Sequence, residues 1–190
     1  QSTGHIVNNN SVYNNVITGA IFGGVIGSGY TTSVSDTKIF NNTFYKNNTK
    51  TAYFINWWGG FENSMFATYW YNNIIDNNFD KSTRNTNSEF AWGDGGNNGK
   101  PSNYFFKNNL LATEISTNRG PSNFSTTFTF NYDTASHMIG TAKFKDTANL
   151  DFSLLSTSVG IGAGTASLTT TKDFYGADRP APVGSGVDLG

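Results

Sequence analysis

The side chains best suited to acid–base chemistry gather in one segment of the chain, Phe79 to Tyr104. Arginine or lysine can remove a proton from carbon when a nearby cation neutralises the adjacent carboxylate, and aspartate and glutamate can hold a calcium ion. If a site for such chemistry lies within this chain, Arg84 or Lys100 would be the base, and Glu89 and Asp94 would be calcium ligands. The alternative is a solvated insertion whose charges have no specific role.

Tryptophan offers a second kind of chemistry, which is recognition of the apolar faces of sugar rings. Trp57 and Trp58 are adjacent, and neighbouring residues of a strand point to opposite faces, so we expect one of them to face outward. Glu62 follows shortly after and can bind hydroxyl groups, and Trp92 lies in a later repeat. We predict these residues as substrate-binding. The alternative is that the tryptophans pack inside the protein.

The composition limits the partners of the chain. With 12 Lys and Arg against 13 Asp and Glu, the 190 residues carry a net charge of −1, which gives no basic surface for nucleic acid. No apolar run is long enough to span a bilayer, and the absence of cysteine excludes disulfides and thiolate metal sites. Low charge with abundant Asn, Thr and aromatic residues is typical of a secreted protein that faces a neutral or sugar-rich partner.

The elements that would position these residues repeat along the chain. Doubled asparagines recur with spacings of 32, 31 and 36 residues, at Asn9-Asn10, Asn41-Asn42, Asn72-Asn73 and Asn108-Asn109. Apolar or aromatic residues flank each pair, and a second apolar segment follows each in turn: AIFGGVIG, AYFINWW, EFAWG and TFTFNY. A period of this size indicates a stacked repeat array.

The repeating unit is extended rather than helical. Its apolar segments are short, are rich in β-branched and aromatic residues, and hold no helical stripe over three turns. We therefore predict an all-β solenoid in which each coil pairs with the next at about 4.8 Å. Asparagine tolerates the left-handed conformation of a corner, and its amide can donate and accept along the stack. Asn42, Asn73 and Asn109 are predicted to form such an asparagine ladder at one corner.

Two coil segments and the tail carry a resemblance to a known family. The coil segments are KIFNNTFYKNN (38–48) and YNNIIDNN (71–78), and the tail is DFYGADRPAPVGSGVDLG (173–190). They resemble right-handed parallel β-helix proteins of the pectate-lyase-like superfamily, whose secreted members often close with such a tail. The resemblance implies a right-handed parallel β-helix over residues 1–155 and a closing segment packed on it over residues 156–190.

The resemblance also implies a secreted, carbohydrate-active protein, because the superfamily contains polysaccharide lyases and glycoside hydrolases. The NTD, DD, GHG and RIK motifs of its galacturonan hydrolases are absent, since Gly4-His5 is followed by Ile6. We therefore expect a polysaccharide lyase that acts by β-elimination on a uronate-containing glycan, with catalytic residues that can lie outside this chain. The alternative is a non-catalytic extracellular adhesin, filament or spacer built on the same solenoid.

A further partner is expected at the N-terminal end. Proteins of this superfamily usually have more coils and an N-terminal cap, whereas this sequence opens inside a coil at GHIVNNN. An uncovered first coil would expose apolar core and an unpaired edge. We therefore expect further β-helix coils before Gln1, in the same precursor or in another chain.

Overall fold

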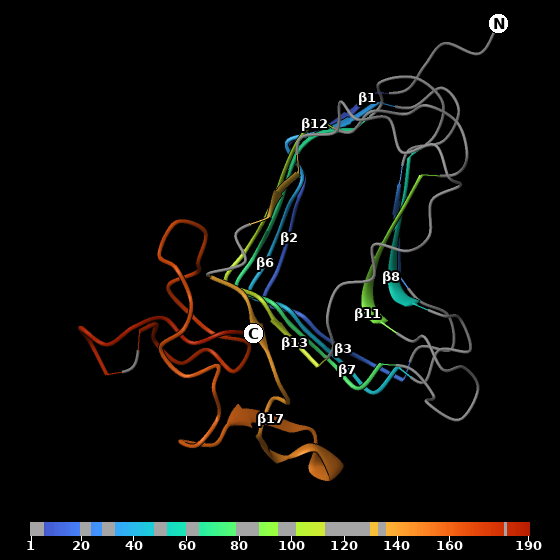
Figure 1. Ribbon diagram of the computed structural model, residues 1–190. Coiled ribbons are helices and arrows are strands. Elements are labelled where there is room, and N and C mark those ends of the chain that lie inside the picture. Colours follow the sequence, from blue (N-terminus) through green and yellow to red (C-terminus); the bar gives the residue numbers. More distant parts are fainter. Residues whose placement is uncertain are drawn as a thin grey trace, which may run out of the picture.

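Short β-strands make up the regular structure of the computed structural model, which contains almost no helix (Figure 1). The structure describes residues 6–19, 24–27, 33–47, 53–59, 65–78, 88–94, 102–112, 130–132, 136–180 and 182–190. In these ranges the one helical element is a short 3-10 turn, η1 (Thr147–Asn149). The predicted all-β class is confirmed.

Among the described residues, the strands form three parallel sheets, here called A, B and C, and one antiparallel hairpin. Sheet A holds β1 (Ile6–Asn8), β2 (Ser11–Tyr13), β5 (Ser33–Ser35), β6 (Lys38–Phe40), β9 (Met65–Tyr71), β12 (Ser102–Lys107) and β14 (Phe130–Tyr132). Sheet B holds β3 (Val16–Thr18), β7 (Thr43–Tyr45), β10 (Ile74–Asp76), β13 (Leu110–Leu111) and β15 (Met138–Ile139). Sheet C holds β4 (Gly24–Gly27), β8 (Tyr53–Gly59) and β11 (Ser88–Asp94), and the hairpin pairs β16 (Phe144–Asp146) with β17 (Asp151–Leu154).

Neighbouring strands of a sheet come from successive repeats of the sequence. In sheet B the register places Val16 beside Thr43, Thr43 beside Ile74, Ile74 beside Leu110 and Leu110 beside Met138. Figure 1 shows sheets A and B meeting at a corner, with sheet C on the opposite side of the stack. The predicted parallel stacking of repeats is confirmed for these strands.

Two details of the predicted repeat are wrong. The fourth apolar segment, TFTFNY, contributes β14 to sheet A, whereas the first three contribute β4, β8 and β11 to sheet C. In addition, the segment from Phe79 to Tyr104 is not one insertion, because its residues 88–94 form β11, paired with β8. This strand coincides with EFAWG, the third of the recurring apolar segments.

The core lies between sheets A and B. Ile39, Trp70 and Phe106 stack in register on sheet A and are at most 1% exposed. Their partners on sheet B are Phe44, Ile75 and Leu111, and the Trp70 ring lies 6.2 Å from that of Phe44. Trp70 is therefore a core residue, as the packing alternative for the tryptophans predicts.

The doubled asparagines form the corner between sheets A and B, and the two members of each pair have different roles. The first member, at Asn14, Asn41, Asn72 and Asn108, has a left-handed backbone with φ between 52° and 59°. The second member stacks its side chain on that of the next repeat. Asparagine suits both positions because it tolerates positive φ and because its amide both donates and accepts.

The ladder of second members runs through four successive repeats. Asn15 Nδ2 donates to Asn42 Oδ1 at 2.9 Å, Asn42 Nδ2 to Asn73 Oδ1 at 3.0 Å, and Asn73 Nδ2 to Asn109 Oδ1 at 2.9 Å. Asn42, Asn73 and Asn109 are completely buried. The predicted ladder is confirmed, and a second one joins Asn47 Nδ2 to Asn78 Oδ1 at 2.6 Å at the next corner.

The register predicted for the first coil is wrong. Asn14-Asn15, not Asn9-Asn10, aligns with Asn41-Asn42, because β2 pairs Val12 with Ile39. Asn9 belongs to the preceding corner, where it and Asp36 have positive φ values of 54° and 50°. The sequence NNNSVYNN turns two corners within a few residues. Spacing alone could therefore not show which of its asparagine pairs aligns with Asn41-Asn42.

The chain beyond β15 covers the outer face of sheet B. Ile74 and Leu110 point outward there and join a hydrophobic cluster with Ala142 and Leu189, against which Phe144 and Leu154 also pack. These strands are thus apolar on both faces, which is typical of parallel strands covered on both sides. The boundary between coils and closing segment at residues 155 and 156 remains a prediction.

The tail segments GAGT and VDLG fold against each other on this face. Gly164 N–H donates to Val187 O at 2.7 Å, and Gly162 N–H donates to the Asp188 carboxylate at 2.6 Å. The Gly190 N–H then donates to Asn72 O of the corner at 2.9 Å, and the Arg179 guanidinium donates to the Gly190 carbonyl. The tail is therefore held both to itself and to the stack.

Candidate functional site

Several residues predicted from the sequence to act in a site lie outside the described residues. These are Arg84 and Lys100, predicted as the base, and Glu62, predicted to bind substrate. Their assignments stay predictions.

The other predicted site residues lie on neighbouring strands of sheet C, whose backbone is described. The register pairs Trp92 of β11 with Trp57 of β8, and Gly93 with Trp58. Glu89 and Asp94 lie near opposite ends of β11. The backbone thus brings Trp57 and Trp92 side by side, which is compatible with their predicted role without testing it.

Groups that could bind metal are not clustered in the described part of the chain. Among its side chains, no three of His, Cys, Asp and Glu lie together in a way that could hold an ion. The calcium ligands predicted at Glu89 and Asp94 stay predictions, because the structure does not describe their side chains.

A set of aromatic side chains lies on the outer face of β2, β6, β9 and β12 of sheet A, and we call it the aromatic strip. On β6, β9 and β12 the residues alternate with the buried Ile39, Trp70 and Phe106, so they point away from the core. One row along the stack is Lys38, Tyr69 and Phe105, and the other is Tyr13, Phe40, Tyr71 and Lys107.

The rings of the aromatic strip stack from one strand of sheet A to the next. Tyr69 and Phe105 lie 4.9 Å apart with planes only 2° from parallel, and Tyr13 and Phe40 lie 5.1 Å apart at 18°. Tyr69 also meets Tyr71 edge to face at 6.3 Å, which joins the two rows. The result is a rigid apolar platform, because each ring is fixed by its neighbours.

Access to the aromatic strip differs along its length. Phe40 is covered by its neighbours, whereas Tyr13 is 48% exposed and Tyr69, Tyr71 and Phe105 are partly exposed. Lys38 and Lys107 are also partly exposed and carry positive charge at opposite ends of the two rows. An extended ligand with apolar faces and negative charges could therefore contact rings and ammonium groups together.

The sequence contains a signal for this strip that the repeat argument did not use. The segments KIF, YWY and YFFK are aromatic or apolar at nearly every position, whereas a strand with one solvated face alternates apolar with polar residues. Aromatic residues at outward positions of three successive repeats indicate a surface with a role beyond folding.

Burial in the aromatic strip affects the ionisation of Tyr71. Desolvation, with a smaller contribution from Tyr69, raises the pKa of Tyr71 above its usual value of 10.0. The folded state therefore holds this proton more strongly than the unfolded state, so folding stability should fall as the pH rises from about 10 through the raised pKa.

Tyr71→Phe should remove this part of the alkaline loss of stability. Urea unfolding of both proteins at neutral pH and above pH 10 measures it. As the pH rises above about 10, the free energy of unfolding of the wild type should fall relative to that of the variant. A difference that does not change with pH would contradict the assignment.

Comparisons of the chain with family models, with curated proteins and with solved structures found no match. In the described ranges, no helix has the length and apolar character needed to cross a membrane.

Proposed function

We propose that the chain forms a secreted, right-handed parallel β-helix that binds an acidic polysaccharide along the aromatic strip. The parallel pairing of successive repeats in three sheets and the asparagine ladder support the β-helix. Crossover connections between parallel strands are right-handed in about 98% of cases, which supports the handedness.

The observation that carries the binding proposal is the stacked pair Tyr69 and Phe105, in a row that begins with Lys38. Aromatic faces bind the C–H faces of sugar rings, and ammonium groups bind uronate carboxylates. Because the strip runs from coil to coil, a polymer laid along it would meet a new ring or charge at each coil, about 4.8 Å from the last.

We further propose that the bound polymer is a substrate for β-elimination. The resemblance to polysaccharide lyases supports this step, and so does the presence of Lys38 and Lys107 on the surface where uronate carboxylates would lie. Arg84 and Lys100 remain the proposed bases. The alternative proposal, a non-catalytic adhesin or spacer, would use the same strip for attachment alone.

Replacing both Tyr69 and Phe105 with alanine should weaken binding to pectate or alginate at least about tenfold, because the platform is lost. Affinity electrophoresis or titration calorimetry measures this effect. Lys107→Gln should weaken binding to these acidic polymers more at low salt than at high salt. Lys143→Gln, an exposed lysine away from the strip, is the matched control. Unchanged affinity in the aromatic double variant would refute the binding site.

An absorbance assay separates the enzyme from the adhesin. Elimination leaves an unsaturated uronate that absorbs ultraviolet light, so a lyase reports its own activity on pectate, alginate or glycosaminoglycan. An absorbance increase that Arg84→Ala or Lys100→Ala abolishes would place the base within this chain. Binding without any absorbance change, with and without calcium, would favour the adhesin.

A further inference from the structure

The first asparagines of the corner also attach the closing segment to the stack. Asn72 donates to Thr165 O at 2.7 Å and to Leu168 O at 2.8 Å, and its Oδ1 accepts from Thr165 N–H. Asn108 donates to Ala163 O, and Asn14 donates to Lys172 O. The side-chain amides at this position thus bind tail backbone in three coils.

Asn41 is the exception. It occupies the same corner position with the same left-handed backbone, and it is only 1% exposed. Yet neither its Oδ1 nor its Nδ2 has a hydrogen-bond partner among the described residues. A buried amide without a partner costs free energy, so a ligand or water is expected to satisfy it.

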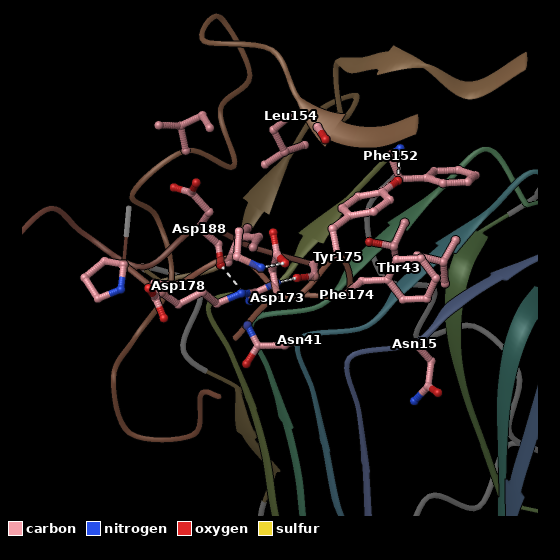
Figure 2. A pocket seen from close by; sticks show the side chains of 18 residues that line it. Asn15, Asn41, Thr43, Phe152, Leu154, Asp173, Phe174, Tyr175, Asp178 and Asp188 are labelled. Carbon is pink, nitrogen blue, oxygen red and sulfur yellow. Dashed lines mark hydrogen bonds between the residues drawn. The ribbon is translucent and has the colours of Figure 1, made fainter. Parts of the chain in front are cut away.

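The Asn41 amide lines a cavity of about 200 Å³ between the corner and the tail (Figure 2). Phe152 of the hairpin and Asp173, Phe174, Tyr175 and Arg179 of the tail form other walls. Figure 2 shows the amide of Asn41 directed toward the side of the cavity where Asp173 lies. This space can hold several water molecules or one small ring.

The aromatic wall of the cavity is held in place. The Tyr175 hydroxyl donates to Leu150 O at 2.9 Å and accepts from Phe152 N–H at 2.7 Å. Phe174 lies edge to face with Tyr175 at 5.1 Å, and both rings are about half exposed. These rings are therefore preorganised and accessible, as a sugar-binding wall requires.

The polar wall favours a neutral ligand. Three carboxylates line the cavity, Asp173, Asp178 and Asp188. Asp178 is paired with Lys172 at 2.5 Å, which leaves Asp173 and Asp188 against the one guanidinium of Arg179. That guanidinium already donates to the carbonyls of Asp188 and Gly190. An anionic sugar would meet net negative charge, whereas hydroxyl groups can donate to carboxylates and accept from an amide.

We propose that this cavity binds a single neutral sugar ring, with the Asn41 amide hydrogen-bonded to its hydroxyls and Phe174 and Tyr175 against its apolar face. The cavity shares no residue with the aromatic strip. It would therefore be a second carbohydrate site, and this proposal does not depend on whether the strip binds a polymer.

The experiment is saturation-transfer NMR and titration calorimetry of the full chain with methyl glycosides of glucose, galactose, mannose and xylose, and with galacturonate. We expect at least one neutral glycoside to bind at millimolar concentration and galacturonate not to bind. Asn41→Gly keeps a residue suited to the left-handed backbone and removes the amide, so it should weaken binding about tenfold. Phe174→Ala should do the same.

Two controls make the result specific. Asn77→Gly makes the same substitution at an exposed left-handed corner position away from the cavity, and Tyr69→Ala alters only the aromatic strip. Both should keep glycoside binding. Binding that survives Asn41→Gly and Phe174→Ala would place the sugar elsewhere, and galacturonate as the sole ligand would overturn the neutral assignment. If no glycoside binds, the cavity holds ordered water and the proposal fails.

Discussion

Replacing Asn73 with alanine should lower the free energy of unfolding by roughly 3 kcal/mol or more, because it breaks the ladder at its buried centre. The Asn73 side chain makes four hydrogen bonds. It donates to Ile39 O and to Asn109 Oδ1, and it accepts from the backbone and side-chain N–H groups of Asn42. Each buried group left without a partner costs about 1–3 kcal/mol.

Asn15→Ala is the matched control at the exposed end of the same ladder. It loses the bonds to Tyr13 O and Asn42 Oδ1, where water can replace the missing amide, so it should cost no more than about 1 kcal/mol. Urea unfolding of the two variants and the wild type gives both values. Equal losses at the two positions would show that burial of the ladder is not what stabilises it.

Gly186→Ala should destabilise the closing segment by about 3 kcal/mol, because the tail backbone crosses itself at this residue. An added Cβ would collide with the Gly162 carbonyl oxygen and would lie 2.9 Å from the Gly162 Cα. Neither of the two crossing segments can move away without disturbing the hydrogen bonds from Gly162 to Asp188 and from Gly164 to Val187. We expect thermal unfolding at lower temperature and faster proteolysis within residues 156–190.

Gly140→Ala tests whether the effect comes from the crossing. A Cβ at Gly140 would meet Val159 and Leu110 side chains at 3.8 and 4.0 Å, which is ordinary contact. This variant should be within about 0.5 kcal/mol of the wild type. If Gly186→Ala is equally mild, the close approach of the two tail segments does not contribute to stability.

The sequence was sufficient to predict the corner because asparagine has few other reasons to recur in pairs between apolar residues. Backbone tolerance and amide stacking act locally, so Asn42, Asn73 and Asn109 could be predicted from spacing. The alignment of the first repeat could not be predicted in this way, because Asn9-Asn10 and Asn14-Asn15 both lie at corners. Only strand pairing shows which pair aligns with Asn41-Asn42.

The surfaces were harder to predict than the corner. The aromatic strip depends on which of two alternating faces points outward, and that depends on the register of Ile39, Trp70 and Phe106. The cavity depends on a tail that meets Asn41 from more than a hundred residues away in sequence. Contacts at such separations follow from packing and leave no periodic trace in the sequence.

The ladder also gives the stack a direction. Every amide from Asn15 to Asn73 donates from Nδ2 to the amide oxygen of its C-terminal neighbour in the ladder, so the side-chain dipoles point the same way. Hydrogen bonds in such a chain polarise one another, so each link is stronger than it would be alone. A repeat with a non-amide residue at this position would divide the ladder into two shorter ladders. Each of these would lose the polarisation that the other supplies. The strength of any one corner therefore depends on how many uninterrupted corners lie on either side of it.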